Sequence, residues 1–433
     1  MPATDPAVPA PGLDRRLGLA DAVVLGVGSM LGAGVFAVLA PAAASAGPAL
    51  LVGLAIAAVV AYANAMSTAQ LAAVMPTSGG AYRYGRERLG PWWGYAAGWC
   101  FVLGKTASCA AMAMTFAAYV LPDWQRPVAV AAVVVLVAVN ERGITRTAGV
   151  TRVLVAVTTV VLAAVVVAGV AALDGPRTAL AAGAGTDAGD ASVLEVLRSA
   201  GLLFFAMAGY ARIATLGGEV RDPRRTIPRA IGIALGAVLV VYALVAVVAL
   251  AVVGPAGLAT STAPLVDVVT AAGRPELAPL VRVGAAAACL GALLGLVAGV
   301  GRTTFAMAQE GDLPRRLAAV HPRSRVPHLA ERAVGVAVIA LVLVADVRTL
   351  LGFSSFGVLL YYGVANAAAL TQRGRERRWP RALHVVGLVG CLVLAVTLPP
   401  SGALAAAAVL AVGLLGRHLA RRRASGRGDA AAS

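Results

Sequence analysis

The amino-acid sequence predicts an all-α integral membrane protein with about twelve transmembrane helices. Of its 433 residues, 60% are hydrophobic and only 13% are charged, which is too little charge for the surface of a soluble protein of this length. Long apolar runs alternate with short arginine-rich stretches, and this pattern is typical of bilayer spans joined by short loops. We therefore expect the chain to lie in a lipid bilayer.

The apolar runs indicate where the helices lie. Two of them, 127–140 and 382–398, are shorter than the roughly 20 residues that cross a bilayer core, so we expect these helices to extend or tilt. The outer loops near 174–191 and 254–278 are long enough for short surface helices. Ser192 and Glu195 form a capping-box pattern at the start of the sixth helix. The expected helices are 19–45, 48–75, 91–121, 127–140, 148–173, 192–219, 230–253, 279–309, 328–345, 347–371, 382–398 and 400–420.

The basic residues indicate the orientation. The formal net charge is +16, and 27 of the 36 basic residues fall at a terminus or in every second loop. This asymmetry follows the positive-inside rule and predicts a cytoplasmic (inner) membrane protein with both termini in the cytoplasm. A nucleic-acid-binding protein would instead gather its positive charge on one folded surface, so we expect no nucleic-acid partner.

Residues for metal binding or covalent chemistry do not cluster. Cys100, Cys109, Cys289 and Cys391 lie within apolar runs without paired spacing, and the four histidines form no ligand set. We expect no metal, no cofactor and no enzymatic activity.

Glycine clusters interrupt two of the expected helices. The first carries four glycines between Gly26 and Gly34, and the sixth carries Gly209 followed by Gly217 and Gly218. Each glycine inside a helix costs about 1 kcal/mol, so both segments favour local unwinding. Close helix packing through Gly28 and Gly32 is the alternative explanation. A pair of interrupted helices five apart favours a midplane binding site between two inverted repeats.

Four sequence motifs, in the same order along the chain, resemble those of the amino acid–polyamine–organocation (APC) permeases. Together they cover residues 17–375. The motifs are Gly28-Ser-Met-Leu-Gly-Ala-Gly-Val-Phe36 with Ala46-Gly-Pro48; Met75-Pro-Thr-Ser-Gly-Gly-Ala-Tyr-Arg-Tyr84; Glu219-Val-Arg-Asp-Pro-Arg-Arg-Thr-Ile-Pro228; and Gly301-Arg302 with Ala306-Met-Ala-Gln-Glu-Gly-Asp-Leu-Pro314.

The resemblance implies a 5+5 inverted repeat with broken helices 1 and 6, plus two extra C-terminal helices. It also implies secondary transport of an amino acid by alternating access. The chain then divides into an N-terminal cytoplasmic tail (1–18), a transport core (19–375), helices 11 and 12 (376–420) and a basic cytoplasmic tail (421–433).

By the same resemblance, the substrate lies between the two broken helices. Free backbone N–H groups near Ala33 and Gly34 would bind its carboxylate, because a half-helix N-terminus attracts anions. Carbonyl groups at Met30 and from Ala206 to Ala208 would bind its amine. Phe205 falls where the family places an aromatic gate, although simple packing also explains a phenylalanine there.

The chain departs from the family pattern at charged positions. Ala211 stands where many members carry an acid, and Arg212 follows it. Thr158 and Thr159 stand where some proton-coupled members carry a lysine. The only lysine of the chain, Lys105, lies in the middle of an expected span. An ionisable group inside a membrane suggests a function, and a buried lysine, unlike arginine, can lose its proton.

We therefore predict an amino acid permease that is coupled to protons or works by exchange, with Lys105 as the candidate coupling group. Lys105 and Arg212 disfavour cationic substrates, so a neutral or anionic amino acid is expected. Three alternatives stay open at this point. In the first, Lys105 and Arg212 have structural roles, and Arg212 pairs with Glu219. In the second, sodium is the coupling ion and binds near Val27–Gly28 and Thr303–Thr304. In the third, the protein is a polyamine or cationic amino acid exchanger, or a sensor. The oligomeric state is not predicted.

Overall fold

The computed structural model describes residues 17–75, 79–142, 148–173, 191–214, 220–324 and 326–431, and this part of the chain is almost entirely helical. Ten helical segments within it are long and apolar enough to cross a membrane. The expected all-α membrane fold is confirmed. The expected spans at 328–345 and 382–398 are also helices, but each has only 17 residues, so the count of twelve spans remains a prediction.

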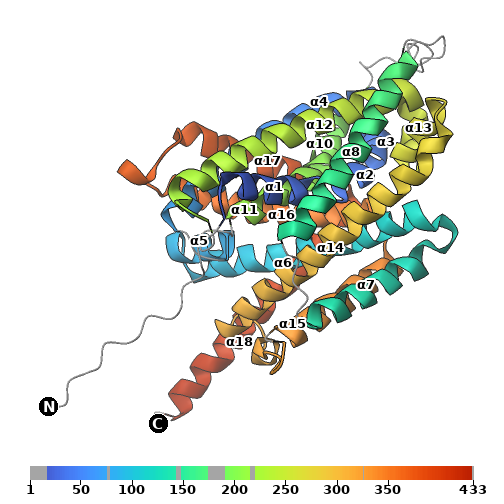
Figure 1. The fold of residues 1–433 in the computed structure, drawn as a ribbon. Helices are drawn as coiled ribbons and strands as arrows, with labels where there is room; N and C mark the ends of the chain where they lie inside the picture. The colour runs from blue at the N-terminus through green and yellow to red at the C-terminus, as the bar shows by residue number, and fades with distance from the viewer. Residues whose placement is uncertain are drawn as a thin grey trace.

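The helices form one bundle in which α5 lies at one end and α13 at the other (Figure 1). The α-helices are α1 (Leu19–Met30), α2 (Gly34–Ala37), α3 (Leu39–Ala46), α4 (Leu50–Val74), α5 (Ala81–Arg88), α6 (Pro91–Val120), α7 (Gln125–Glu141), α8 (Ala148–Leu173), α10 (Val193–Met207), α11 (Ala211–Ala214), α12 (Pro223–Thr260), α13 (Pro264–Ala271), α14 (Ala278–Gln309), α15 (His328–Val344), α16 (Val347–Leu370), α17 (Arg381–Thr397) and α18 (Pro400–Ala431).

The first expected helix is broken, as its glycine cluster predicts. α1 ends at Met30, and α2 begins at Gly34 after a short non-helical segment. α2 and α3 then continue with a single residue, Val38, between them. The residues around this break are buried, so its backbone groups must be satisfied by protein, as is required at membrane depth.

The sixth expected helix is broken at its own glycine. α10 ends at Met207, a 3₁₀ turn (η3, Ala208–Tyr210) follows, and α11 restarts at Ala211. Gly217, Gly218 and Glu219 lie outside the described residues, and so does the proposed pairing of Arg212 with Glu219. The predicted capping box is confirmed at the start of α10. The Glu195 N–H donates to the Ser192 hydroxyl (3.3 Å), and the Ser192 N–H donates to the Glu195 carboxylate (2.8 Å).

Several helix boundaries differ from the sequence-based ones. α12 starts at Pro223, seven residues before the expected 230, because proline is well tolerated in a first turn; Gly254, with φ of 77°, interrupts it near the expected end. α13 fills part of the loop expected at 254–278. α18 continues to Ala431, into the segment expected as a tail.

Candidate functional site

Both helix breaks are held by one tyrosine. The Tyr242 hydroxyl of α12 lies 2.5 Å from the Met30 carbonyl oxygen, at the end of α1, and 3.1 Å from the Ala206 carbonyl oxygen, near the end of α10. A hydroxyl carries a single proton, so it donates fully to only one of these oxygens at a time. The second carbonyl therefore keeps the capacity to accept a hydrogen bond from another donor.

The two breaks touch each other at Gly34. A Cβ on Gly34 would lie 2.7 Å from both Cα and Cβ of Ala206 and 3.3 Å from the Tyr242 hydroxyl. Any side chain at this position would therefore push α2 away from α10. The first residue of α2 and the carbonyl end of α10 thus lie side by side.

A second close approach joins the breaks one turn further along. A Cβ on Gly209 would lie 2.4 Å from the Ser29 carbonyl oxygen, so η3 lies directly against the last turn of α1. The Ala208 carbonyl accepts a hydrogen bond from the Tyr362 hydroxyl of α16 at 2.9 Å. Carbonyl groups of Met30, Ala206 and Ala208 therefore converge between α1 and α10, and each has a tyrosine hydroxyl within hydrogen-bonding distance.

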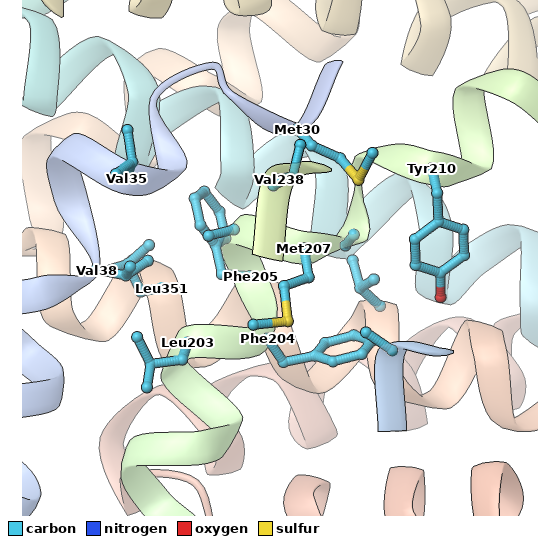
Figure 2. Packing of buried hydrophobic residues seen from close by; sticks show 14 of the residues in the cluster. Met30, Val35, Val38, Leu203, Phe204, Phe205, Met207, Tyr210, Val238 and Leu351 are labelled. Carbon is cyan, nitrogen blue, oxygen red and sulfur yellow. The ribbon is translucent and has the colours of Figure 1, made fainter. Parts of the chain in front are cut away.

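Phe205 lies among the buried residues between the breaks. Figure 2 shows its ring on the side of α10 that faces Met30 and Val35, whereas Phe204 points away. Phe205 is 9% exposed. Phe204 packs edge-on against Tyr362, with 5.9 Å between ring centroids. The position of Phe205 is compatible with both earlier interpretations, a gate over the substrate and a packed core residue.

Lys105 lies at the middle of α6 and is half-buried. Its neighbours on α6 contact α16: a Cβ on Gly104 would lie 2.9 Å from the Ser354 carbonyl oxygen, and the Ser108 and Ser354 hydroxyls are 2.6 Å apart. Within the part of the chain that the structure describes, the Lys105 ammonium makes no hydrogen bond or ion pair. A lysine amino group without a described hydrogen-bond partner at mid-span can form a hydrogen bond with another molecule.

Lys105 lies at a different level of α6 from the contact of this helix with α2. α2 meets α6 near Tyr119, where the Phe36 and Tyr119 rings pack edge to face at 5.6 Å. Tyr119 is fourteen residues beyond Lys105, or about 21 Å along an α-helix. Arg212 is on α11, just past the second break, and its side chain is exposed, whereas Ala211 and Ile213 are buried.

The residues considered for sodium are not brought together. The first break contacts α14 at Ala292, because a Cβ on Gly32 would lie 2.7 Å from the Ala292 Cβ. Thr303 is eleven residues further along α14, about 17 Å away on a helix, and its hydroxyl donates to the Gly299 carbonyl. Thr158 of α8 instead shares a small crevice with Gly28. The contact at Gly32 also shows that helix packing, the alternative explanation for the glycines, operates alongside the break.

Contacts at both ends of the bundle enclose the breaks. At the α13 end, the Tyr119 hydroxyl lies 3.3 Å from the Phe36 carbonyl oxygen and accepts from the Leu265 N–H at 3.3 Å. At the opposite end, Arg152 of α8 forms an ion pair with Asp21 of α1.

Sequence reasoning missed Tyr242 and Tyr362. Each is a phenol within a long apolar run, and a buried tyrosine hydroxyl needs a hydrogen-bond partner. That rule could have marked both residues as candidates, but it could not have identified the carbonyl groups that they bind. No group of three or more His, Cys, Asp or Glu residues suitable for a metal occurs among the described residues.

An all-helical membrane bundle in which two interrupted helices meet at their breaks is typical of one class of membrane transporter. The chain matches the family described as "Amino acid permease" over residues 17–413. It therefore belongs to the amino acid permease family, within the APC superfamily, and is a multi-pass membrane transporter.

Individual relatives agree with this assignment. An uncharacterized transporter of Mycobacterium tuberculosis is 59% identical over 417 residues, which cover 95% of this chain and 93% of the relative. The branched-chain amino acid permease BcaP of Bacillus subtilis is 24% identical, with 87% and 84% of the two chains covered. Human cationic amino acid transporter 4 is 28% identical over 85% of this chain and 61% of the relative.

Proposed function

We propose that this protein is a secondary active transporter that moves a neutral or anionic amino acid across the cytoplasmic membrane by alternating access. The observation that carries the proposal is the meeting of the two breaks at Gly34 and Ala206. The start of α2, which no side chain caps, suits a carboxylate, and the Met30 and Ala206 carbonyls suit an ammonium. These two groups are common to all α-amino acids.

The electrostatics favour a substrate without net positive charge. Lys105 lies half-buried in α6 without a described partner, and Ala211 leaves the second break without the acid found in many members of the family. A cationic side chain would therefore meet a like charge and no counter-ion, which is costly in a low-dielectric site. The branched-chain permease BcaP is a relative that fits this expectation, so L-isoleucine is our first test substrate.

A cationic substrate is the second candidate, because human cationic amino acid transporter 4 is among the relatives. Competition experiments in proteoliposomes separate the two. Radiolabelled L-isoleucine uptake should be reduced by unlabelled neutral or acidic amino acids, and arginine, agmatine and putrescine should have no effect at equal concentration. Strong inhibition by any of these cations would instead indicate a polyamine or cationic amino acid exchanger. A protein that binds amino acids without measurable flux would be the sensor.

We further propose that Lys105 carries the coupling proton. Its apolar surroundings favour the neutral amine, and a bound substrate carboxylate would favour the ammonium, so the group could exchange its proton during the cycle. Lys105→Arg keeps the cation but cannot release it. We therefore expect substrate binding to persist in this variant while accumulation driven by an imposed pH gradient stops.

The control for this experiment is Lys105→Ala. It should leave downhill exchange intact but insensitive to a pH gradient. A purely structural lysine would give a different pattern, with loss of folded protein in the alanine variant and recovery in the arginine variant. Proton-driven accumulation by Lys105→Arg would show that another group carries the proton.

A further inference from the structure

A fully buried polar cluster joins α4, α16 and α17 on the far side of Tyr362 from the helix breaks. All its members have no exposed surface. They are Asn64, Ser67, Gln70, Asn366, Gln372 and His384. Polar side chains inside a membrane protein are costly unless they are paired. The direction of each hydrogen bond in this cluster can be deduced, and it determines the protonation state of the histidine.

The orientation of the Gln70 amide is set by the backbone. Its Oε1 accepts from the N–H groups of Arg378 (2.7 Å) and Trp379 (3.1 Å), in the connection between α16 and α17. The amide nitrogen must then be the atom that faces Gln372 Oε1 at 2.7 Å and His384 Nε2 at 3.3 Å. Because this nitrogen can only donate, His384 Nε2 is an acceptor and carries no proton.

The other ring nitrogen of His384 carries the proton. Asn366 Nδ2 donates to the Tyr362 carbonyl at 2.9 Å, so Asn366 Oδ1 is the atom 2.7 Å from the Ser67 hydroxyl. The Ser67 hydroxyl donates its single proton to Asn366 Oδ1 or to the Ala63 carbonyl oxygen at 2.9 Å. The Ser67 oxygen is therefore free to accept from His384 Nδ1, which is 2.6 Å away. His384 is thus the neutral Nδ1–H tautomer.

Protonation of His384 conflicts with this arrangement. A second proton, on Nε2, would point at the Gln70 amide N–H groups, which are donors as well. Gln70 could turn its oxygen toward the histidine only by withdrawing it from the Arg378 and Trp379 N–H groups. Buried N–H groups without acceptors cost about 1–3 kcal/mol each, so protonation loosens the connection between α16 and α17.

The cluster is connected to the second helix break through α16. Asn366 is one turn beyond Tyr362 and bonds to its carbonyl, and the Tyr362 hydroxyl donates to the Ala208 carbonyl. α17 rests directly on Asn366, since a Cβ on Gly387 would lie 2.4 Å from the Asn366 Oδ1. A change at His384 therefore reaches Asn366, and through Tyr362 it reaches η3.

We propose that neutral His384 is a positioning residue for the second helix break, and that its protonation releases Ala208 and slows transport. This inference rests on the proposed transport function. The other ionisable groups on the elements packed around His384 are of types that do not ordinarily bind a proton between about pH 5 and pH 7.5. They are Tyr362 of α16, Arg377 and Arg378 in the connection, Cys391 of α17, and, beside Thr397 at the far end of α17, Arg198 of α10.

The test is exchange of L-isoleucine at equal pH on both sides of the proteoliposome membrane, so that no proton gradient drives it. Isoleucine stays zwitterionic between about pH 5 and pH 7.5. We expect wild-type exchange to fall at least about threefold toward the acid end of this interval, as the protonated population of His384 grows. His384→Asn keeps an N–H for Ser67 and cannot titrate. It should lose less than about twofold.

A second variant removes the conflict without removing the histidine. Gln70→Glu offers one carboxylate oxygen to the Arg378 and Trp379 N–H groups and the other to a protonated Nε2. Gln372, whose Nε2 has no partner, can donate to the same carboxylate. We expect this variant also to keep its exchange rate at about pH 5. His418→Asn, at an exposed histidine of α18, is the control and should keep the wild-type profile.

The outcomes distinguish this inference from the proposed function. A wild-type profile that is flat with pH, or an unchanged acid fall in His384→Asn, would overturn the role of His384. Inactivity of His384→Asn at every pH, with a lowered melting temperature, would make the residue merely structural and would also overturn it. If wild-type protein transports no amino acid, the proposed function fails, and the melting temperatures still test His384: acid should lower that of wild type more than that of His384→Asn.

Discussion

Glycine and tyrosine have complementary roles at the two helix breaks. Gly34 allows α2 to contact Ala206, and the Tyr242 hydroxyl can donate to either the Met30 or the Ala206 carbonyl beside the breaks. Backbone groups at membrane depth must be paired with protein or with water in a cavity. The breaks are therefore stable because residues from a third helix, α12, supply the missing donor.

The first residue-scale prediction concerns Gly34. Gly34→Ala places a Cβ 2.7 Å from the Ala206 Cα, a backbone atom that cannot move aside cheaply, and Gly34→Val adds further bulk. Both should abolish isoleucine binding in a thermal-shift assay while the protein still inserts in the membrane. Gly236→Ala is the matched control, because its Cβ would meet no atom within 4 Å and alanine favours a helix. Normal affinity in Gly34→Val would place the substrate elsewhere.

The second residue-scale prediction concerns Tyr242. Tyr242→Phe keeps the ring but leaves the Met30 and Ala206 carbonyls without their donor, which should cost about 1–3 kcal/mol. We expect a lower melting temperature and a transport rate reduced about tenfold or more. Tyr62→Phe serves as the control, because Tyr62 of α4 is 47% exposed. Equal effects of the two substitutions would show that Tyr242 does not hold the breaks.

At the scale of elements, α18 is attached to the bundle by a buried ion pair. Arg417 of α18 lies 2.8 Å from Asp312, and both side chains are 3% exposed. The guanidinium also stacks over the Tyr95 ring at 4.3 Å. Asp312 accepts from the Tyr82 hydroxyl of α5 at 3.0 Å, and burial, together with this carboxylate, raises the pKa of Tyr82, so the phenol stays a neutral donor. α5, α18 and the connection that follows α14 thus meet at one carboxylate.

This arrangement predicts a large effect for a distant residue. Arg417→Met leaves a buried carboxylate with fewer partners and should destabilise the protein by about 3 kcal/mol. The effect should appear as a lower melting temperature with little change in substrate affinity. Arg274→Met is the control, because its pair with Glu276 is 60% exposed on both sides and such pairs contribute about 0–1 kcal/mol. Similar melting temperatures for the two variants would contradict the proposed attachment of α18.

At the scale of the whole molecule, the charge distribution predicts how the bundle is oriented in the membrane. We expect the α5 end to face the cytoplasm, because the arginine-rich connections lie there. Arg373 is at this end, next to Glu376, which pairs with Arg88 of the α5 helix. Thr260 ends α12, just before α13.

Cysteine labelling tests this orientation. All four native cysteines are buried, so background labelling should be low. A membrane-impermeant maleimide added to intact cells should label Thr260→Cys, and it should label Arg373→Cys only after permeabilisation. The reverse pattern would invert the topology and place both termini outside.

Local patterns in the chain were sufficient for the class of fold, most helix positions and both helix breaks. Helical spans follow from apolar length, and the breaks follow from clustered glycines such as those from Gly26 to Gly34, because both depend on interactions between near neighbours. The capping box at Ser192 is another local feature that could be recognised directly. The resemblance motifs added the family, which the match over residues 17–413 confirms.

Only the tertiary structure could decide which distant residues meet. Tyr242 binds Met30 across 212 residues, and His384 binds Ser67 across 317. The same limit applies to Thr303, which was a candidate ligand because it carries a hydroxyl in the eighth expected helix, and which lies eleven residues along α14 from the contact with the first break. Helix periodicity determines which face a residue occupies, but the packing of whole helices determines what that face contacts. The physical reason is that hydrogen bonds and close backbone contacts between helices depend on distance in space, and a sequence directly specifies only distance along the chain.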